Sequence, residues 1–321
     1  MLFISISAII KKNFLSRHKM ITILLMILFI SYLVYRKAFY SSPKKRSTTH
    51  LLPDTPQYAK VNPVIKKLIA EMEEVPFEEV SITTFDGLQL FARYYHLSDS
   101  APLQIQFHGY RSTAVRDFSG GFSLARKMGR NLLVVDQRAG GKSEGTTICF
   151  GIKEKYDCLE WIKYAINRFG DIPIMLTGVS MGAATVLMAS ELDLPKNVKC
   201  IVADCPYTSP YEIIAKECRE MGIPPKIGMP FVILGARIFG NLKLSGEGAE
   251  KAVRNTKVPI LLVHGADDDF VPCEMGRRIY EANPEMITFE VFPEAAHGVS
   301  FIVDTERYEK LYYGLYDKYG V

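Results

Sequence analysis

The stretch IPIMLTGVSMGAATVLMASEL, residues 172–192, decides the fold. An apolar run, residues 172–176, leads directly into GVSMG and then into good helix formers, residues 183–192. Short apolar runs bounded by glycine are typical of buried strands, and a change from strand to helix without a linker requires a sharp turn. Glycines two residues to either side of Ser180 let the backbone pass closely at this turn, so that the Ser180 hydroxyl points outward.

Similar apolar runs recur along the chain and alternate with helical patterns. Near-continuous apolar strands separated by helices predict a mostly parallel sheet covered on both faces. Two runs flanking Asp86 and Gly87 alternate instead and predict an antiparallel hairpin. Ligands bind beyond the carboxyl ends of parallel strands, so the residues that follow each run are candidates for chemistry. The expected strands are residues 80–85, 88–96, 103–107, 132–135, 172–176, 198–203, 260–263 and 289–292, and helices are expected over 154–169 and 274–282, among others.

Ser180 is the first candidate for a covalent nucleophile, but a hydroxyl needs a general base, an orienting carboxylate and oxyanion donors. HGADDDFVP, residues 264–272, follows one expected strand and carries three consecutive acids, and PEAAHGVS with His297 follows the last. The order Ser180, acid, His297 is the order of an α/β-hydrolase triad. In such a triad, His297 would take the Ser180 proton and return it to the leaving group, while the carboxylate orients the imidazole.

Two other histidines compete for the role of base. His108 and His264 each end an apolar run and precede a glycine. Each lies upstream of at least one partner, in the wrong order for the triad, so we interpret both as structural. The remaining histidines, His18, His50 and His96, lie outside the predicted active face.

Five motifs in this order make the chain resemble an α/β-hydrolase of the serine esterase and acylaminoacyl-peptidase-like kind, which includes small bacterial membrane-anchored members. They are FHGYRS (107–112), DQRAGGKSEG (136–145), GVSMG, HGADDDFVP and the AHG around His297. The resemblance covers residues 78–320. It implies the α/β-hydrolase fold, with a mostly parallel, doubly wound sheet.

The resemblance also implies roles for further residues. Members typically carry an acid, two residues and then Val-Pro, which selects Asp268, while Asp204 at the end of an earlier strand stays an alternative. One oxyanion N–H is expected from Met181, the residue after the nucleophile, and the resemblance assigns the other to Tyr110. The loop 136–145 would brace the active face, and Gly140 stands where relatives often carry histidine.

Neither a nucleotide nor a metal is expected. The sequence GGKS inside residues 136–145 suggests a phosphate loop, but the Walker pattern requires glycine where this chain has Asp136. The six cysteines are scattered without metal-ligand spacing. We therefore predict reduced structural thiols, which slightly favours a cytoplasmic body, and no cofactor.

Composition separates a basic arm from a mildly acidic body. The chain has 321 residues, 48% of them hydrophobic, and a formal net charge of +4. Residues 1–46 hold nine Lys or Arg and no acid, which leaves 30 basic against 35 acidic residues in the remainder. Because the body has no basic stripe, we do not expect it to bind nucleic acid.

Within the arm, residues 20–35 are uncharged and mostly apolar, with Lys19 before them and Arg36 after. A bilayer core needs about 20 residues, but snorkelling of the flanking cations can make up the difference. Because no A-x-A-like cleavage site follows, we expect an uncleaved transmembrane anchor, with a signal peptide and a buried helix as alternatives. Cations on both flanks leave the orientation in the membrane open.

The expected organisation is the arm with its anchor, a linker with a lead-in helix over residues 47–77, and the α/β-hydrolase domain over 78–321. Residues 208–257 form a long insertion, with a helix expected over 211–221 and an apolar segment over 227–240. Long structured insertions are often functional, so we expect a helical lid, with a merely packed helical pair as the alternative. An apolar lid would favour a small ester substrate with an apolar acyl group.

These features predict a serine hydrolase that cleaves carboxylic esters, or thioesters, through an acyl-enzyme on Ser180. A serine nucleophile excludes the Asp-dependent dehalogenase and epoxide hydrolase chemistries of this fold. Three alternatives stay open: a serine peptidase of the prolyl-oligopeptidase-like kind, a membrane-lipid or acyl-protein hydrolase, and a catalytically silent binding protein. The short segment before residue 78 argues against the peptidase, whose relatives restrict substrates with a large N-terminal propeller.

Overall fold

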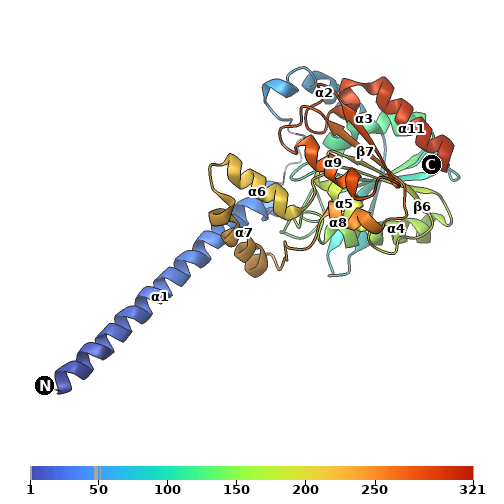
Figure 1. Ribbon diagram of the computed structural model, residues 1–321. Coiled ribbons are helices and arrows are strands. Elements are labelled where there is room, and N and C mark those ends of the chain that lie inside the picture. Colours follow the sequence, from blue (N-terminus) through green and yellow to red (C-terminus); the bar gives the residue numbers. More distant parts are fainter. Residues whose placement is uncertain (1, 47–49, 51, 321) are drawn as a thin grey trace. The chain divides into compact units, whose positions relative to one another are not determined.

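The computed structural model describes residues 2–46, 50 and 52–320, of which 2–17, 45 and 316 are described by their backbone alone. Its centre is an eight-stranded sheet in the order β1-β2-β4-β3-β5-β6-β7-β8, shown in Figure 1. β2 pairs antiparallel with β1 and β4, and the remaining neighbours are parallel. The strands are β1 (Glu78–Thr83), β2 (Gln89–Tyr95), β3 (Leu103–Phe107), β4 (Asn131–Val135), β5 (Ile174–Val179), β6 (Val198–Asp204), β7 (Ile260–Gly265) and β8 (Ile287–Phe292).

Helices cover both faces of this sheet. α4, α5, α8 and α9 share one hydrophobic core with Leu103, Ile105 and Phe107 of β3, and α3 and α11 contribute to the cores on the opposite face. The helices are α1 (Leu2–Ala38), α2 (Asn62–Glu73), α3 (Ala114–Lys127), α4 (Glu154–Phe169), α5 (Met181–Ala189), α6 (Pro210–Glu220), α7 (Pro225–Phe239), α8 (Ala249–Ala252), α9 (Cys273–Ala282), α10 (Ser300–Val303) and α11 (Thr305–Tyr319), with 3₁₀ turns η1 (Pro43–Lys45), η2 (Pro56–Tyr58) and η3 (Val253–Asn255).

The fold class predicted from the sequence is confirmed. Every expected strand overlaps an observed one, and the hairpin expected around Asp86 is the antiparallel β1–β2 pair. The central strands β3 to β7 are buried along nearly their whole length, because helices cover both faces of the sheet, whereas the edge strand β8 is more exposed. All six cysteines are free, in keeping with the expected reduced thiols.

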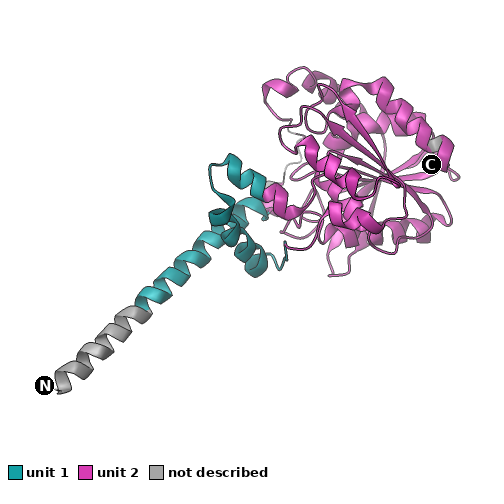
Figure 2. Cartoon of the chain, viewed as in Figure 1, with its two compact units in different colours: residues 1–40, 215–244 teal, residues 41–214, 245–321 magenta. Residues whose placement is uncertain are grey.

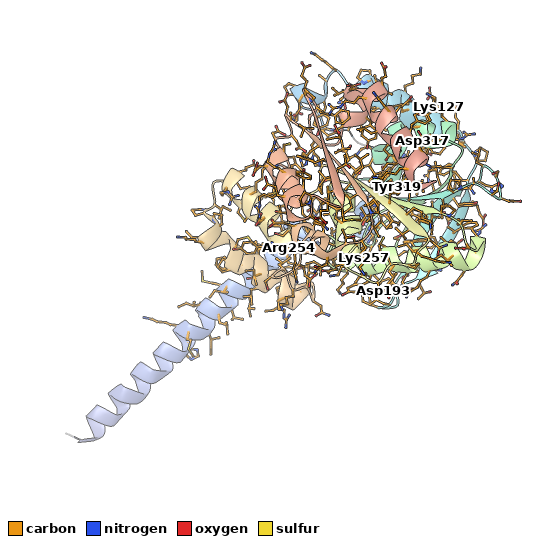
Figure 3. The ribbon with its side chains drawn as sticks, turned by 45° about the vertical axis from the view of Figure 1, so that its right-hand side comes forward. Lys127, Asp193, Arg254, Lys257, Asp317 and Tyr319 are labelled. Carbon is orange, nitrogen blue, oxygen red and sulfur yellow. The ribbon has the colours of Figure 1, made fainter. Side chains whose placement is uncertain are left out.

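The chain divides into two compact units, coloured separately in Figure 2. The first unit consists of residues 1–40 and 215–244, and the second consists of residues 41–214 and 245–321. The sheet and the helices that cover it belong to the second unit. Charged side chains of both signs, among them Lys127, Arg254 and Asp317, lie on its outside (Figure 3).

The first unit is helical. α1 contains a segment, His18–Ala38, that is 21 residues long and has a mean hydropathy of 1.8, long and apolar enough to cross a membrane. α7 packs along α1, and Gly235 lies so close that an added Cβ would come within 2.4 Å of the Ser31 carbonyl oxygen. The ring of Phe239 contacts both Tyr32 and Tyr35. Part of the insertion that we expected to be a lid therefore packs against the expected anchor.

Candidate active site

Ser180 occupies the sharp turn between β5 and α5. Its φ of 56° lies in the left-handed region, where a residue with a side chain is strained. The flanking glycines are sterically required: a Cβ on Gly178 would lie 2.3 Å from the backbone of Gly182, and one on Gly182 would lie 1.7 Å from the Phe107 carbonyl oxygen. This crowding holds the turn in its strained form and places Ser180 at the wall of a cavity.

His297 and Asp268 meet from two different loops. Asp268 Oδ2 lies 2.7 Å from His297 Nδ1, and its Oδ1 accepts hydrogen bonds from the backbone N–H groups of Phe270 and Val271. Burial alone would raise the pKa of Asp268, but hydrogen bonds from His264, His297 and the backbone lower that pKa to about 2. The carboxylate is therefore ionised at neutral pH and orients the imidazole through Nδ1–H, which leaves Nε2 as the acceptor.

The other imidazole nitrogen lies near the thiol of Cys205. His297 Nε2 lies 4.0 Å from Cys205 Sγ, and both His297 and Ser180 line the same cavity. Within the described residues, no hydrogen bond joins the Ser180 hydroxyl to His297. In ligand-free sites such bonds are often long and tighten only when a substrate is bound.

Asp204, the alternative acid, is placed differently. It ends β6 on the cavity wall, and its carboxylate lies 3.4 Å from both the Ser300 and the Tyr308 hydroxyls. Burial raises its pKa to about 6. The structure thus brings Asp268, and not Asp204, into hydrogen-bonding contact with His297.

Of the two residues expected to donate to an oxyanion, Tyr110 lines the same cavity and Met181 directly follows Ser180 in the chain. Met181 begins α5, so its N–H is among those that a helix leaves without an intrahelical acceptor. Tyr110 lines the cavity and follows Gly109, whose N–H donates to Asp117 Oδ2 at 2.6 Å. The buried Asp117 anchors this loop, and sequence reasoning missed it because its role depends on folding back from α3 onto Gly109.

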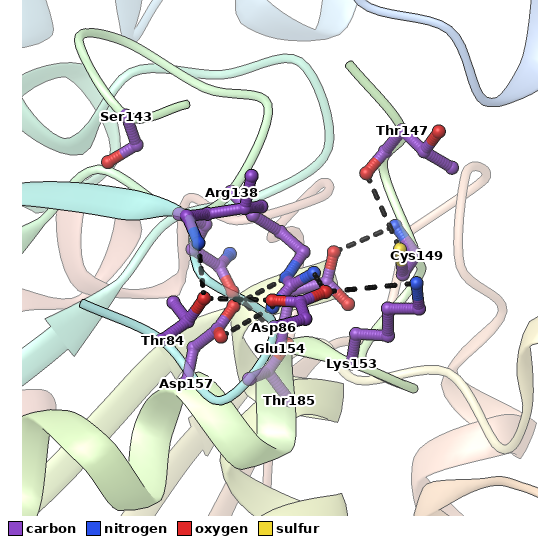
Figure 4. A network of polar contacts seen from close by, with 12 residues as sticks. Thr84, Asp86, Arg138, Ser143, Thr147, Cys149, Lys153, Glu154, Asp157 and Thr185 are labelled. Carbon is purple, nitrogen blue, oxygen red and sulfur yellow. Dashed lines mark hydrogen bonds and ion pairs between the residues drawn. The ribbon is translucent and has the colours of Figure 1, made fainter. Parts of the chain in front are cut away.

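The loop 136–145 contacts His108, and its Arg138 belongs to a buried ionic network. Gln137 N–H donates to His108 Nε2 at 3.1 Å, so His108 is structural, as expected. A Cβ on Gly140 would lie 3.0 Å from the His108 ring and from the Gln137 carbonyl oxygen, so a side chain at this position would require its neighbours to move. Figure 4 shows Arg138 of this loop bonded to Asp86 and, through Nε and Nη2, to Asp157 at 2.6 Å.

The cavity has a volume of about 470 Å³, and one wall comes from the segment that we predicted to be a linker with a lead-in helix. We call residues 52–65 the strap. Tyr58 OH donates to the His297 carbonyl oxygen at 2.8 Å, and Gln57 Nε2 donates to the Asp269 carboxylate at 3.0 Å. The strap is further held by Asn62 Nδ2, which donates to the Pro53 carbonyl at 2.9 Å. No described residue of the predicted lid, 208–257, lines this cavity, so the lid role stays a prediction.

One group of described side chains is close enough to suggest a metal. Donor atoms of Cys205, Asp268 and His297 lie within 4.8 Å of one another. Asp268 and His297 are already bonded to each other, and burial raises the pKa of the Cys205 thiol well above its ordinary value. A protonated thiol is a poor ligand, so this chemistry fits a catalytic acid–base pair better than a metal site.

Comparisons with known proteins agree with the fold described above. A family model described as the alpha/beta hydrolase fold matches residues 108–245, which include the turn at Ser180. The chain has the α/β-hydrolase fold. A solved esterase, Pf2001 of Pyrococcus furiosus, has a TM-score of 0.64 and 22% identity, and the match covers 84% of this chain and 97% of that one.

Two curated relatives match this chain over part of their length. YqkD of Bacillus subtilis is 27% identical over 187 residues, covering 57% of this chain and 61% of that protein. The lysophosphatidylserine lipase ABHD12 of Danio rerio is 24% identical over 196 residues, covering 59% of this chain and 50% of the lipase. The match thus spans between half and about three fifths of these relatives. Hydrolases, lipases and esterases recur among the named relatives and neighbours, so the fold and the relatives are those of enzymes.

Proposed function

We propose that this protein is a serine hydrolase that cleaves carboxylic esters through an acyl-enzyme on Ser180, with thioesters as an alternative substrate. The observation that carries the proposal is the 2.7 Å contact between His297 Nδ1 and the ionised Asp268, at a cavity whose wall also holds Ser180 on a strained turn. A base oriented by a buried carboxylate beside an alcohol on the cavity wall is the requirement for nucleophilic catalysis by serine.

The proposed reaction follows from these positions. His297 Nε2 accepts the Ser180 proton as Oγ attacks the ester carbonyl, and the N–H groups of Met181 and Tyr110 receive the developing oxyanion. The protonated imidazole then gives its proton to the departing alcohol. Water, deprotonated by His297, attacks the acyl-enzyme and releases the acid, and Ser180 regains its proton.

The direct test uses p-nitrophenyl butyrate and a fluorophosphonate probe. Ser180→Ala should lower turnover by a factor of at least about 10³ and abolish labelling, because the covalent intermediate cannot form. Ser123→Ala, an exposed serine on α3, is the matched control and should retain both. Undiminished turnover by the Ser180 variant would end the assignment, and an active wild type without labelling at Ser180 would place the nucleophile elsewhere.

We also propose that the N-terminal helix is an uncleaved membrane anchor, and that the hydrolase domain occupies residues 78–321 behind an arm (1–46) and a linker (47–77). The apolar segment His18–Ala38 supports the anchor, although a signal sequence passes the same criteria. Intact-mass analysis of protein extracted from membranes separates the two: an anchor keeps residues 1–40, whereas a signal peptide loses them.

A membrane-lipid or acyl-protein hydrolase is the second candidate. The apolar helix favours it, and so does the similarity to a lysophosphatidylserine lipase. If it is right, kcat/KM should rise with acyl-chain length from acetate to dodecanoate. A preference for acetyl esters would favour a small-ester hydrolase, and cleavage of peptide amides alone would favour the peptidase.

A further inference from the structure

The cavity beside Ser180 has a polar inner wall that the proposed mechanism does not use. On the face of the sheet turned toward α3 and α11, β3 presents Gln104 and Gln106, and β5 presents Thr177. Central strands of parallel sheets are ordinarily apolar on both faces, so glutamine at alternate positions is unexpected there. The opposite face of β3 carries Leu103, Ile105 and Phe107, as expected for a core strand.

Gln106 is the anomaly within this wall. Its side chain is fully buried from bulk solvent, yet neither its amide nitrogen nor its amide oxygen has a hydrogen-bond partner among the described residues. Its neighbour Gln104 does have partners, donating to Thr177 at 3.3 Å and accepting from Arg130 at 3.4 Å. Leaving a buried amide unpaired is costly, so an unpaired amide on a cavity wall indicates a bound group that pairs with it.

We infer that this inner wall is a binding subsite for an uncharged hydroxyl- or amide-bearing group of the ester substrate, paired with Gln106. The inference rests on the proposed function and names the substrate class. The neighbouring polar groups are amides and hydroxyls, which match a neutral partner. Asp204 lies on the same wall and would repel an anion, and the lining cation Arg116 is paired with Asp117 at 3.0 Å. A phosphate group therefore does not fit here.

The pairing of β3 with β5 fixes the distance between the Gln106 subsite and the ester carbon at Ser180. Gln106 lies beside Thr177, three residues before Ser180, and strands rise about 3.3 Å per residue. The substrate hydroxyl that pairs with Gln106 should therefore lie about 10 Å from the ester carbon, roughly the length of an extended eight-carbon chain.

Two matched pairs of esters test the subsite on each side of the scissile bond. They are p-nitrophenyl 8-hydroxyoctanoate against octanoate, and 8-hydroxyoctyl acetate against octyl acetate. We expect the wild type to prefer the hydroxylated member of one pair about tenfold in kcat/KM, the worth of one or two hydrogen bonds. Gln106→Met should remove that preference, lowering kcat/KM for the hydroxylated member much more than for the plain one, whereas Gln89→Met, at the exposed first residue of β2, should keep the preference. Equal rates within both pairs for the wild type, or an equal loss on both members in Gln106→Met, would overturn the inference.

A second readout does not depend on turnover. 1,8-octanediol should raise the thermal midpoint of the wild type more than octanol does, and Gln106→Met should lose this difference while being more stable without ligand. If octanoate is not hydrolysed but the diol still discriminates, the proposed function fails and the subsite stands. If octanoate is hydrolysed but neither readout discriminates the hydroxylated compound from the plain one, the subsite is overturned and the proposed function stands.

A separate observation concerns the first unit. One outward face of α7 is apolar: Ile227 and Ile238 lie three turns apart on it and are 61% and 50% exposed. The exposed cations Lys226 and Arg237 lie at one margin of this face, between it and Ile233, which is 43% exposed. A surface helix ordinarily exposes polar residues, so an apolar outer face indicates contact with another molecule, either a protein or a membrane. On the adjoining α1, the exposed residues of the segment His18–Ala38 are also largely apolar.

The geometry points to α7 as a second membrane element, lying in the bilayer interface against the anchor helix. The occupant of its outer face is lipid, because α7 packs through Gly235 and Phe239 on α1, whose segment His18–Ala38 also exposes apolar side chains and is long enough to cross a bilayer. The exposed cations Arg36, Lys226 and Arg237 suit anionic headgroups. Apolar side chains on one face with cations at its margin are the pattern of helices that lie in the interface.

Bromolipid quenching tests this placement in the full chain. Trp161 is the only tryptophan and is fully buried, so an indole added at Ile238 reports its own surroundings. In vesicles of brominated phosphatidylcholine with 20% phosphatidylglycerol, Ile238→Trp should lose more than half of its added fluorescence, and Tyr313→Trp on α11 should lose little. Equal quenching at the two positions would overturn the placement. So would an unquenched indole at position 238 whose helix crosslinks to a second copy, because the face would then be a protein interface.

Discussion

The Tyr58 phenol donates a 2.8 Å hydrogen bond to the backbone carbonyl of His297, so a residue that precedes the first strand holds the loop of the proposed general base. The loop is also held at its side chain by Asp268. Two contacts from segments far apart in the chain thus fix both the backbone and the ring of His297. A loop without regular structure needs such contacts to keep a base in position.

Removal of this contact should affect the rate more than binding. Tyr58→Phe keeps the ring and deletes the donor, so the His297 loop gains freedom and we expect kcat to fall about three- to tenfold with KM nearly unchanged. Steady-state kinetics on p-nitrophenyl butyrate provide the measurement. A change confined to KM would mean that the strap only shapes the binding cavity.

The choice of acid can be tested by neutral substitutions. Asp268→Asn should lower kcat by a factor on the order of 10³ to 10⁴, because the amide no longer holds the imidazole tautomer that accepts the Ser180 proton. Asp267→Asn, on the exposed neighbour, should change kcat less than twofold. A large loss in Asp204→Asn with little loss in Asp268→Asn would move the role to the end of β6.

Asp204 should make stability depend on pH. Burial raises its pKa to about 6 from an ordinary 3.8, and it faces His264, His297, Asp268 and the Tyr308 hydroxyl. Between pH 4 and 6 the unfolded chain loses this proton before the native state does, so native stability falls as pH rises through this window. This rise of the pKa from 3.8 to about 6 corresponds to roughly 3 kcal/mol in the free energy of unfolding.

The measurement is the difference in thermal midpoint between Asp204→Asn and the wild type from pH 4 to 7. Because the amide does not titrate, the thermal midpoint of the variant relative to that of the wild type should increase as pH rises, and most of this increase should be complete by pH 7. A difference that stays constant with pH would mean that the native carboxyl titrates near its ordinary value.

Cys205 should be chemically inert although it lies 4.0 Å from His297 Nε2. Its side chain is fully buried, and burial raises the pKa of the thiol, so little thiolate forms. Iodoacetamide on the native protein should modify the partly exposed Cys273 first and leave Cys205 unmodified, as read by peptide mass spectrometry. Rapid alkylation of Cys205 with loss of turnover would instead indicate that a thiol takes part in the reaction.

The chain itself predicts those parts of the protein that depend on local pattern. The apolar runs mark the strands, the glycines around Ser180 mark the turn, and the order of Ser180, acid and His297 marks the proposed triad, because each follows from neighbouring residues or from the common edge of a parallel sheet. The choice among three consecutive acids already needed the family resemblance, and the structure shows why it matters: Asp268 alone of the three bonds to His297.

Only the tertiary structure decides the contacts between distant, irregular segments. The strap over the cavity, the unpaired amide of Gln106 and the packing of α7 on α1 have no local signal, because each depends on where a loop or a helix face lies after folding. Hydrophobic periodicity indicates that a face is buried but not which partner buries it. The sequence therefore determines the strands of the sheet and the order of Ser180, acid and His297 along the chain. The folded chain determines which segments form the walls of the site and which helix faces pack together.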